Sequence, residues 1–283
     1  MKTRKRHDKE RMRRGVYILP NLFTTMNLFA GFFAVLSAIN GNFEKACLFV
    51  IGGMVCDILD GKTARLTKTT SRFGVEYDSL ADLITFGLAP GIMAYLWTLK
   101  QFGKLGWLAA LLFLACGALR LARFNTNVDS ADSAFFTGLP IPGAAGMVVM
   151  TILFSMQLTG GNALNRGVAI IILVGMFTLS FLMVSSIRYT SFKKMPSVLV
   201  NARHFNILVI AVLLMVLIVQ EPVVTLFILI LLYVLSGPVM SVRLFFAGKT
   251  PAAEYDEEEE EMDDLSPIGY DPMDTDEDRV YHT

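Results

Sequence analysis

Long apolar segments separated by short polar stretches run through this chain from about residue 20 to about residue 246. Most are close to the roughly 20 residues that a helix needs to cross the hydrocarbon core of a bilayer. The pattern predicts eight helices, at residues 22–39, 43–66, 77–99, 105–124, 140–158, 167–187, 205–219 and 222–246. The seventh is short, so it can form a hairpin with the eighth in place of a full span. The first helix is expected to begin at Pro20 and Asn21, because proline favours the first turn of a helix.

The composition agrees with a membrane protein. Apolar residues make up 54% of the 283 residues and charged residues 18%, and the mean hydropathy is +0.53. A soluble domain of this length is less apolar than that. We therefore expect an all-α integral membrane protein with about eight transmembrane helices, surrounded by membrane lipids and without a nucleic-acid partner.

Charge is distributed unevenly along the chain, although the formal net charge is zero. Residues 1–14 hold eight Lys or Arg and form a basic arm, which is expected to lie on anionic headgroups at about 1 kcal/mol per basic residue. Residues 248–283 are strongly acidic, and we expect them to be disordered because like charges at that density cannot form a core. Residues 15–247 then form one transmembrane domain.

The positions of Lys and Arg predict the orientation in the cell membrane. With the amino terminus inside, the cytoplasmic segments hold 21 of these residues and the external segments hold 4. Both termini are therefore expected in the cytoplasm. The polar segment between the second and third predicted helices is expected at the same face.

Four aspartates on that side of the membrane form two pairs, Asp57 with Asp60 and Asp78 with Asp82. Spacings of three and four residues place each pair on one face of a helix. Two such helices can face each other with the four carboxylates between them. Small residues on the same faces leave room around the carboxylates: Gly61, Ala64 and Gly74.

Clustered carboxylates beside apolar helices require a compensating cation. One Asp in the bilayer centre costs roughly 2.5–3.5 kcal/mol on insertion scales. The acidic set contains no His or Cys, so hard divalent cations with oxygen ligands are the best match. The alternative is that the acids pair with Lys or Arg. Arg65 is the nearby candidate, and one Arg cannot balance four acids.

The acidic stretch resembles the signature of the CDP-alcohol phosphatidyltransferase family. All eight fixed positions match, in the order Asp57-x2-Asp60-Gly61-x2-Ala64-Arg65-x8-Gly74-x3-Asp78-x3-Asp82. The resemblance implies an integral membrane enzyme that moves a phosphatidyl group from a CDP-linked lipid to a small alcohol and releases CMP. Residues 15–247 would then be a transmembrane catalytic domain, and such enzymes are typically homodimers.

The resemblance also implies roles for individual residues. Two divalent cations, Mg²⁺ or Mn²⁺, would be held by the four aspartates, with Asp57, Asp60 and Asp78 as the principal ligands and Asp82 also acting as general base. Arg65 is expected to hold a phosphate of the CDP group, because its guanidinium is always charged and offers a fork of donors. Other expected contacts to the CDP-lipid are Asn21, Gly61, Ala64, Ser71 and Gly74. Asn and Ser are also ordinary helix caps, so that alternative stays open for Asn21 and Ser71.

Further stretches resemble the phosphatidylserine synthase branch of the family: residues 20–24, 78–90, 118–125 and 138–142. This predicts CDP-diacylglycerol and L-serine as substrates. Arg120, Arg123 and Asn125 are the candidates for binding serine, with anchoring at the membrane interface as the alternative for the two arginines. Other acceptor alcohols, glycerol 3-phosphate or inositol phosphate, remain open. A divalent-cation transporter is the alternative from another class.

Overall fold

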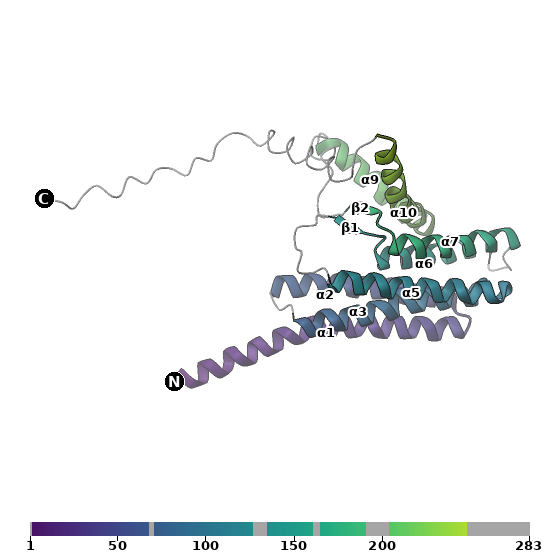
Figure 1. Cartoon of the computed structure of the whole chain (residues 1–283). Coiled ribbons are helices and arrows are strands. Elements are labelled where there is room, and N and C mark those ends of the chain that lie inside the picture. Colours follow the sequence, from purple (N-terminus) through teal and green to yellow (C-terminus); the bar gives the residue numbers. More distant parts are fainter. Residues whose placement is uncertain (1, 68–70, 127–134, 161–164, 191–203, 248–283) are drawn as a thin grey trace. The chain divides into compact units, whose positions relative to one another are not determined.

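The computed structural model describes residues 2–67, 71–126, 135–160, 165–190 and 204–247 (Figure 1). The predicted disordered tail, residues 248–283, lies outside the described residues. The chain divides into two units, Met1–Pro238 and Val239–Thr283. The site and the core described below belong to the first unit.

Helices account for most of the described chain. In order, the elements are α1 (Lys2–Ile39), α2 (Phe43–Thr67), α3 (Arg72–Asp82), η1 (Leu83–Leu88), α4 (Ala89–Trp97), η2 (Leu99–Phe102), α5 (Lys104–Thr126), β1 (Phe135–Thr137), α6 (Ile141–Thr159), α7 (Arg166–Val184), β2 (Arg188–Thr190), α9 (His204–Gln220) and α10 (Pro222–Ala247). Each of the eight predicted segments corresponds to a helix or a run of helices in this order.

Among the described residues, six helical segments are long and apolar enough to cross a membrane, which indicates an integral membrane protein. They are Pro20–Ile39, Arg72–Trp97, Lys104–Thr126, Ile141–Thr159, Arg166–Val184 and Pro222–Arg243. The predicted count of eight spans is therefore not reached. Helix α2 is not among the six, and it is the helix that carries the first pair of aspartates. The apolar part of α9, Leu208–Gln220, is too short, as expected for the seventh segment.

Two features differ from the sequence prediction. Helix α1 begins at Lys2, so the predicted start at Pro20 is wrong. A proline inside a helix costs about 3 kcal/mol, but the Lys, Arg and Glu residues ahead of it have high helix propensity. The chain is mostly helical, as predicted, and it also contains a short antiparallel strand pair, β1 with β2, that the sequence did not predict. Strands of three residues are too short to produce a recognisable alternating pattern.

The first three helical stretches lie side by side. Helices α1 and α2 form a hairpin around Gly41, whose φ of 75° suits a residue without a side chain. The run α3–η1–α4 packs against α1 and also contacts α5, and Figure 1 shows α3 alongside α1. Helix α6 contacts α2 and α4, and α7 contacts α5. The acidic positions on α2 and α3 therefore lie on two helices that both pack against α1, and α5 contacts α3.

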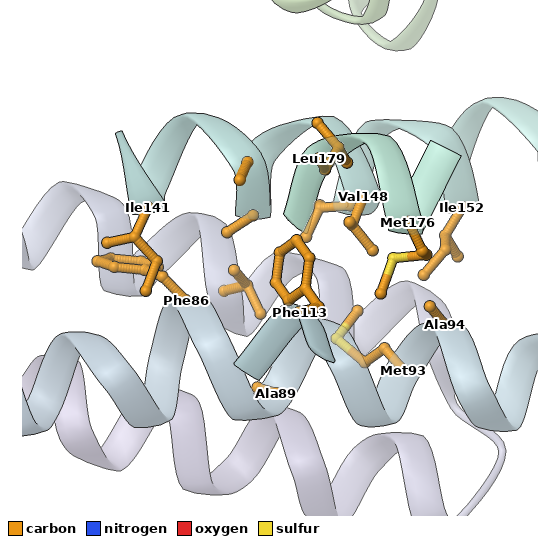
Figure 2. Close-up of a cluster of buried hydrophobic side chains, with 14 of the residues drawn as sticks. Phe86, Ala89, Met93, Ala94, Phe113, Ile141, Val148, Ile152, Met176 and Leu179 are labelled. Atoms are coloured by element: carbon orange, nitrogen blue, oxygen red, sulfur yellow. The ribbon is translucent and has the colours of Figure 1, made fainter. Parts of the chain in front are cut away.

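The hydrophobic core lies where α4, α5, α6 and α7 meet (Figure 2). Phe86 and Phe113 are fully buried there, and Met93 and Met176 approach from α4 and α7. Residues that face outward on the same helices are large and apolar, as lipid contact requires. The core thus fixes one end of the run α3–η1–α4 and leaves Asp78 and Asp82 at its polar end.

Candidate metal centre

Helices α2 and α3 bring three of the four predicted aspartates together. One carboxylate oxygen from each of Asp57, Asp60 and Asp78 lies within 4.8 Å of the others. Asp60 is buried, and Asp57 and Asp78 are half-buried. The two helices face each other as the residue spacing predicts, because each aspartate is on the face that its neighbours on the same helix share.

This group of oxygens fits a divalent cation. Two carboxylates at about 4.8 Å repel each other by about 3–4 kcal/mol if the effective dielectric constant is about 20. Asp78 Oδ1 is also buried without a hydrogen-bond partner among the described residues. A buried acceptor without a partner costs about 1–3 kcal/mol. A cation with oxygen ligands would remove both costs, and Mg²⁺ or Mn²⁺ match a donor set made only of carboxylates.

The fourth aspartate, Asp82, is held separately. It is the last residue of α3 and is buried, and its carboxylate is not part of the group of three. Asn27 Nδ2 of α1 donates a hydrogen bond to Asp82 Oδ1 over 2.8 Å. Its environment therefore differs from that of the other three carboxylates, which is consistent with a separate chemical task.

Helix α1 contributes two polar residues that the sequence analysis missed. Thr24 Oγ1 donates to Asp60 Oδ2 over 3.0 Å, and Asn27 holds Asp82 as described. Both side chains are buried. The signal was present in the sequence: two polar residues three apart share one face of an otherwise apolar helix.

The predicted nucleotide contacts lie close together at the start of α3. Ser71 is the N-cap of α3, and its Oγ accepts a hydrogen bond from the Gly74 backbone N–H over 3.0 Å. A Cβ added at Gly74 would lie 3.1 Å from Ser71 Oγ and 3.6 Å from Asn21 Oδ1. The structure therefore brings Asn21, Ser71 and Gly74 together, and it shows that Ser71 acts as a helix cap.

Two more predicted contacts lie on α2. Gly61 directly follows Asp60 and has open space where a side chain would project. Ala64 is half-buried one turn later. The side chain of Arg65 lies outside the described residues, so its predicted contact with a phosphate stays a prediction.

Two residues that the sequence predicts to bind serine, Arg120 and Arg123, lie near the end of α5. Arg120 Nε is buried without a hydrogen-bond partner among the described residues. The guanidinium interacts electrostatically with Asp82 and with Tyr233 of α10. Arg123 is half-buried, and its positive charge repels that of Arg120. A partly buried cation with an unpaired donor beside Asp82 can bind an anionic group.

Asn125 connects α5 to α3. Its Nδ2 donates to Ser79 Oγ over 3.1 Å and to Glu76 Oε2 over 3.2 Å. The amide is thus already engaged by residues of α3. Its predicted contact with an acceptor substrate is not tested by these hydrogen bonds.

The chain is similar to a known family over more than half its length. The family model described as CDP-alcohol phosphatidyltransferase matches residues 17–179. That range includes the four aspartates, the residues of α1 that hold them, and both arginines of α5.

Individual relatives agree with the family model. A CDP-diacylglycerol–serine O-phosphatidyltransferase of Helicobacter pylori is 43% identical over 181 residues, which cover 63% of this chain and 74% of the relative. One of the same name from Bacillus subtilis is 37% identical over 176 residues, covering 62% and 92%. An archaetidylserine synthase of Methanothermobacter thermautotrophicus is 37% identical over 173 residues, covering 60% and 69%.

Proposed function

Because this chain belongs to the CDP-alcohol phosphatidyltransferase family, we propose that it transfers a phosphatidyl group from CDP-diacylglycerol to the hydroxyl of L-serine. The products are phosphatidylserine and CMP. Membership in a family of transferases contradicts the alternative of a divalent-cation transporter.

One observation carries this proposal beyond the family name. Three carboxylates from α2 and α3 converge within 4.8 Å, and one of their oxygens is buried without a partner among the described residues. Phosphoryl transfer from a diphosphate needs a centre that neutralises phosphate oxygens. Asp57, Asp60 and Asp78 are the residues that would hold two divalent cations, and bound Mg²⁺ or Mn²⁺ supplies that neutralisation and aids the departure of CMP.

The residues of the chain divide the remaining tasks. Asp82, near the metals, accepts the proton of the serine hydroxyl as its oxygen attacks the phosphorus attached to the diacylglycerol. The bond between this phosphorus and the bridging oxygen breaks, and CMP leaves with that oxygen and the bonding electrons as part of its phosphate group. General-base assistance of this kind contributes about 10²–10⁴-fold to a rate.

The nucleotide is proposed to lie against the start of α3 and the end of α2. Asn21, Ser71 and Gly74 lie together there, and open space at Gly61 allows close approach of the CDP group. Ala64 and Arg65 belong to the same site by the family motif, with Arg65 on a phosphate.

L-Serine is proposed to bind between Asp82 and the end of α5. Its carboxylate needs a cation, and Arg120, whose guanidinium attracts Asp82 electrostatically, has a buried Nε without a hydrogen-bond partner among the described residues. Arg123 adds positive charge and Asn125 polar contacts at the rim. Serine lacks the phosphate of glycerol 3-phosphate or inositol phosphate. Two arginines are therefore enough to bind its carboxylate, whereas a phosphate-bearing acceptor calls for more basic residues in the pocket.

The location of the site follows from the charge distribution. We propose that the site opens to the cytoplasmic face of the cell membrane, where water-soluble serine is available, with both termini on that side. A homodimer, which the family resemblance implies, belongs to the same proposal.

The experiment is a CMP-release assay on purified protein in detergent micelles with CDP-diacylglycerol and Mn²⁺. With L-serine we expect CMP and phosphatidylserine in equal amounts, and without it much less CMP. Parallel reactions contain glycerol 3-phosphate or inositol phosphate as the acceptor. A faster reaction with either would replace serine as the substrate, and no CMP release with any acceptor would overturn the proposed function.

A further inference from the structure

Asn27 of α1 occupies an unusual position for an amide in an apolar helix. The side chain is fully buried. Its Nδ2 donates to Asp82 Oδ1, whereas its own Oδ1 has no hydrogen-bond partner among the described residues. An unpartnered buried acceptor is unfavourable by about 1–3 kcal/mol. This cost offsets much of the roughly 1.5–3 kcal/mol that a hydrogen bond to a charged group such as Asp82 contributes, so the amide adds little net stability to the fold.

The backbone of Asn27 is fixed by the same segment that its side chain contacts. Thr85 Oγ1 donates to the Asn27 carbonyl oxygen over 2.8 Å. Thr85 lies three residues after Asp82, inside η1, which is a π-helical turn. Asn27 thus contacts the end of α3 through its amide and η1 through its carbonyl, so α1 and this segment are locked in register.

Two glycines make this close contact possible. A Cβ at Gly53 of α2 would lie 2.8 Å from Asn27 Oδ1 and 2.6 Å from Thr85 Cγ2, and a Cβ at Gly31 of α1 would collide with Thr85 Oγ1. Contacts below about 3 Å force a neighbour to move. The amide therefore has little freedom to turn away from Asp82.

We propose that Asn27 is a positioning residue that orients the carboxylate of Asp82 for proton transfer from the acceptor hydroxyl. The inference rests on the proposed function, because Asp82 is the proposed base. One carboxylate oxygen is held by the Asn27 amide, which limits rotation of the carboxylate toward the group formed by Asp57, Asp60 and Asp78. A misplacement of about 1 Å at a reacting group can cost 10²-fold in rate.

The test is steady-state kinetics of Asn27→Leu, which keeps the branched shape and removes the donor. We expect kcat to fall about tenfold or more, while KM for L-serine and for CDP-diacylglycerol and the affinity for Mn²⁺ change less than about threefold. The melting temperature should stay within about 3 °C of wild type. Asn27→Ala also removes the donor, and its smaller side chain cannot crowd the neighbouring residues. It should show the same loss of kcat.

The matched control is Ser155→Ala, which removes a buried hydroxyl that accepts from Trp97 Nε1 at the end of α4 away from Asp82. It should leave kcat near wild type. Unchanged kcat in both Asn27 variants, or a loss that comes with raised KM values and a lower melting temperature, would overturn the positioning role. An inactive wild-type protein in the same assay would instead count against the proposed function itself.

Discussion

At the scale of single residues, the convergence of the acidic side chains could be predicted from the sequence, because helical spacing fixes which side chains share a face. Asp57, Asp60 and Asp78 converge as that spacing predicts. Thr24 and Asn27 were missed because each hydrogen bond joins residues far apart in sequence, and only packing of α1 against α2 and α3 reveals the pairs. The serine-binding residues stay predictions, because a pocket for a small zwitterion has no spacing rule.

Asp78→Asn should weaken Mn²⁺ binding and lower turnover by at least about tenfold each. The reason is that even residues that only support metal ligands typically change metal affinity or activity by 10–100-fold. The measurement is a Mn²⁺ titration followed by electron paramagnetic resonance, alongside CMP release. Wild-type affinity for Mn²⁺ in this variant would remove Asp78 from the metal centre.

Arg120→Ala should raise KM for L-serine by about tenfold or more, with a smaller effect on KM for CDP-diacylglycerol. A hydrogen bond to a charged group contributes about 1.5–3 kcal/mol, which corresponds to that change. Arg120→Lys is the matched control, because it keeps the charge and should recover part of the loss. If the serine dependence of Arg120→Ala equals that of wild type, Arg120 serves as an anchor at the membrane interface.

At the scale of elements, most boundaries followed from hydropathy, and the departures have local causes. The run α3–η1–α4 was predicted as one helix, but a π-helical turn interrupts it directly after Asp82. Such turns occur often at functional sites, and no propensity marks them. Here Thr85 of the turn lies in the space that Gly31 of α1 and Gly53 of α2 leave open. The position of the turn therefore depends on the packing of α1, α2 and η1 together.

The N-cap of α3 yields a prediction about Ser71. Ser71→Ala should destabilise the start of α3 by about 1 kcal/mol, because the Gly74 N–H loses its partner. Ser71→Asn keeps capping ability and should restore the melting temperature. Since the hydroxyl is also a proposed nucleotide contact, KM for CDP-diacylglycerol should be raised in both variants. A normal KM in Ser71→Asn would limit Ser71 to capping.

At the scale of the whole molecule, the sequence predicted a helical membrane protein, and the described part of the chain has six helical segments able to span a bilayer. The predicted eight counted α2, which carries charged residues near both ends, and α9, whose apolar part is short. The orientation rests on the positions of Lys and Arg relative to the membrane, and it stays a prediction. The acidic tail lies outside the described residues.

Orientation can be measured by labelling single cysteines in a background in which Cys47, Cys56 and Cys116 are replaced by alanine. Asn42→Cys lies in the exposed turn after α1, and Lys62→Cys is exposed near the end of α2. A maleimide that does not cross membranes should label Asn42→Cys on intact cells and Lys62→Cys only after permeabilisation. The reverse pattern would place the acidic site outside.

The central claim is that carboxylates of two facing helices form one metal centre on which phosphatidyl transfer depends. Its most direct test measures CMP release with L-serine by protein stripped of divalent ions, as Mn²⁺ is restored stepwise. We expect no turnover without metal, saturable recovery in wild type, and recovery only at higher Mn²⁺ in Asp57→Asn. Full turnover by the metal-free protein would contradict the claim.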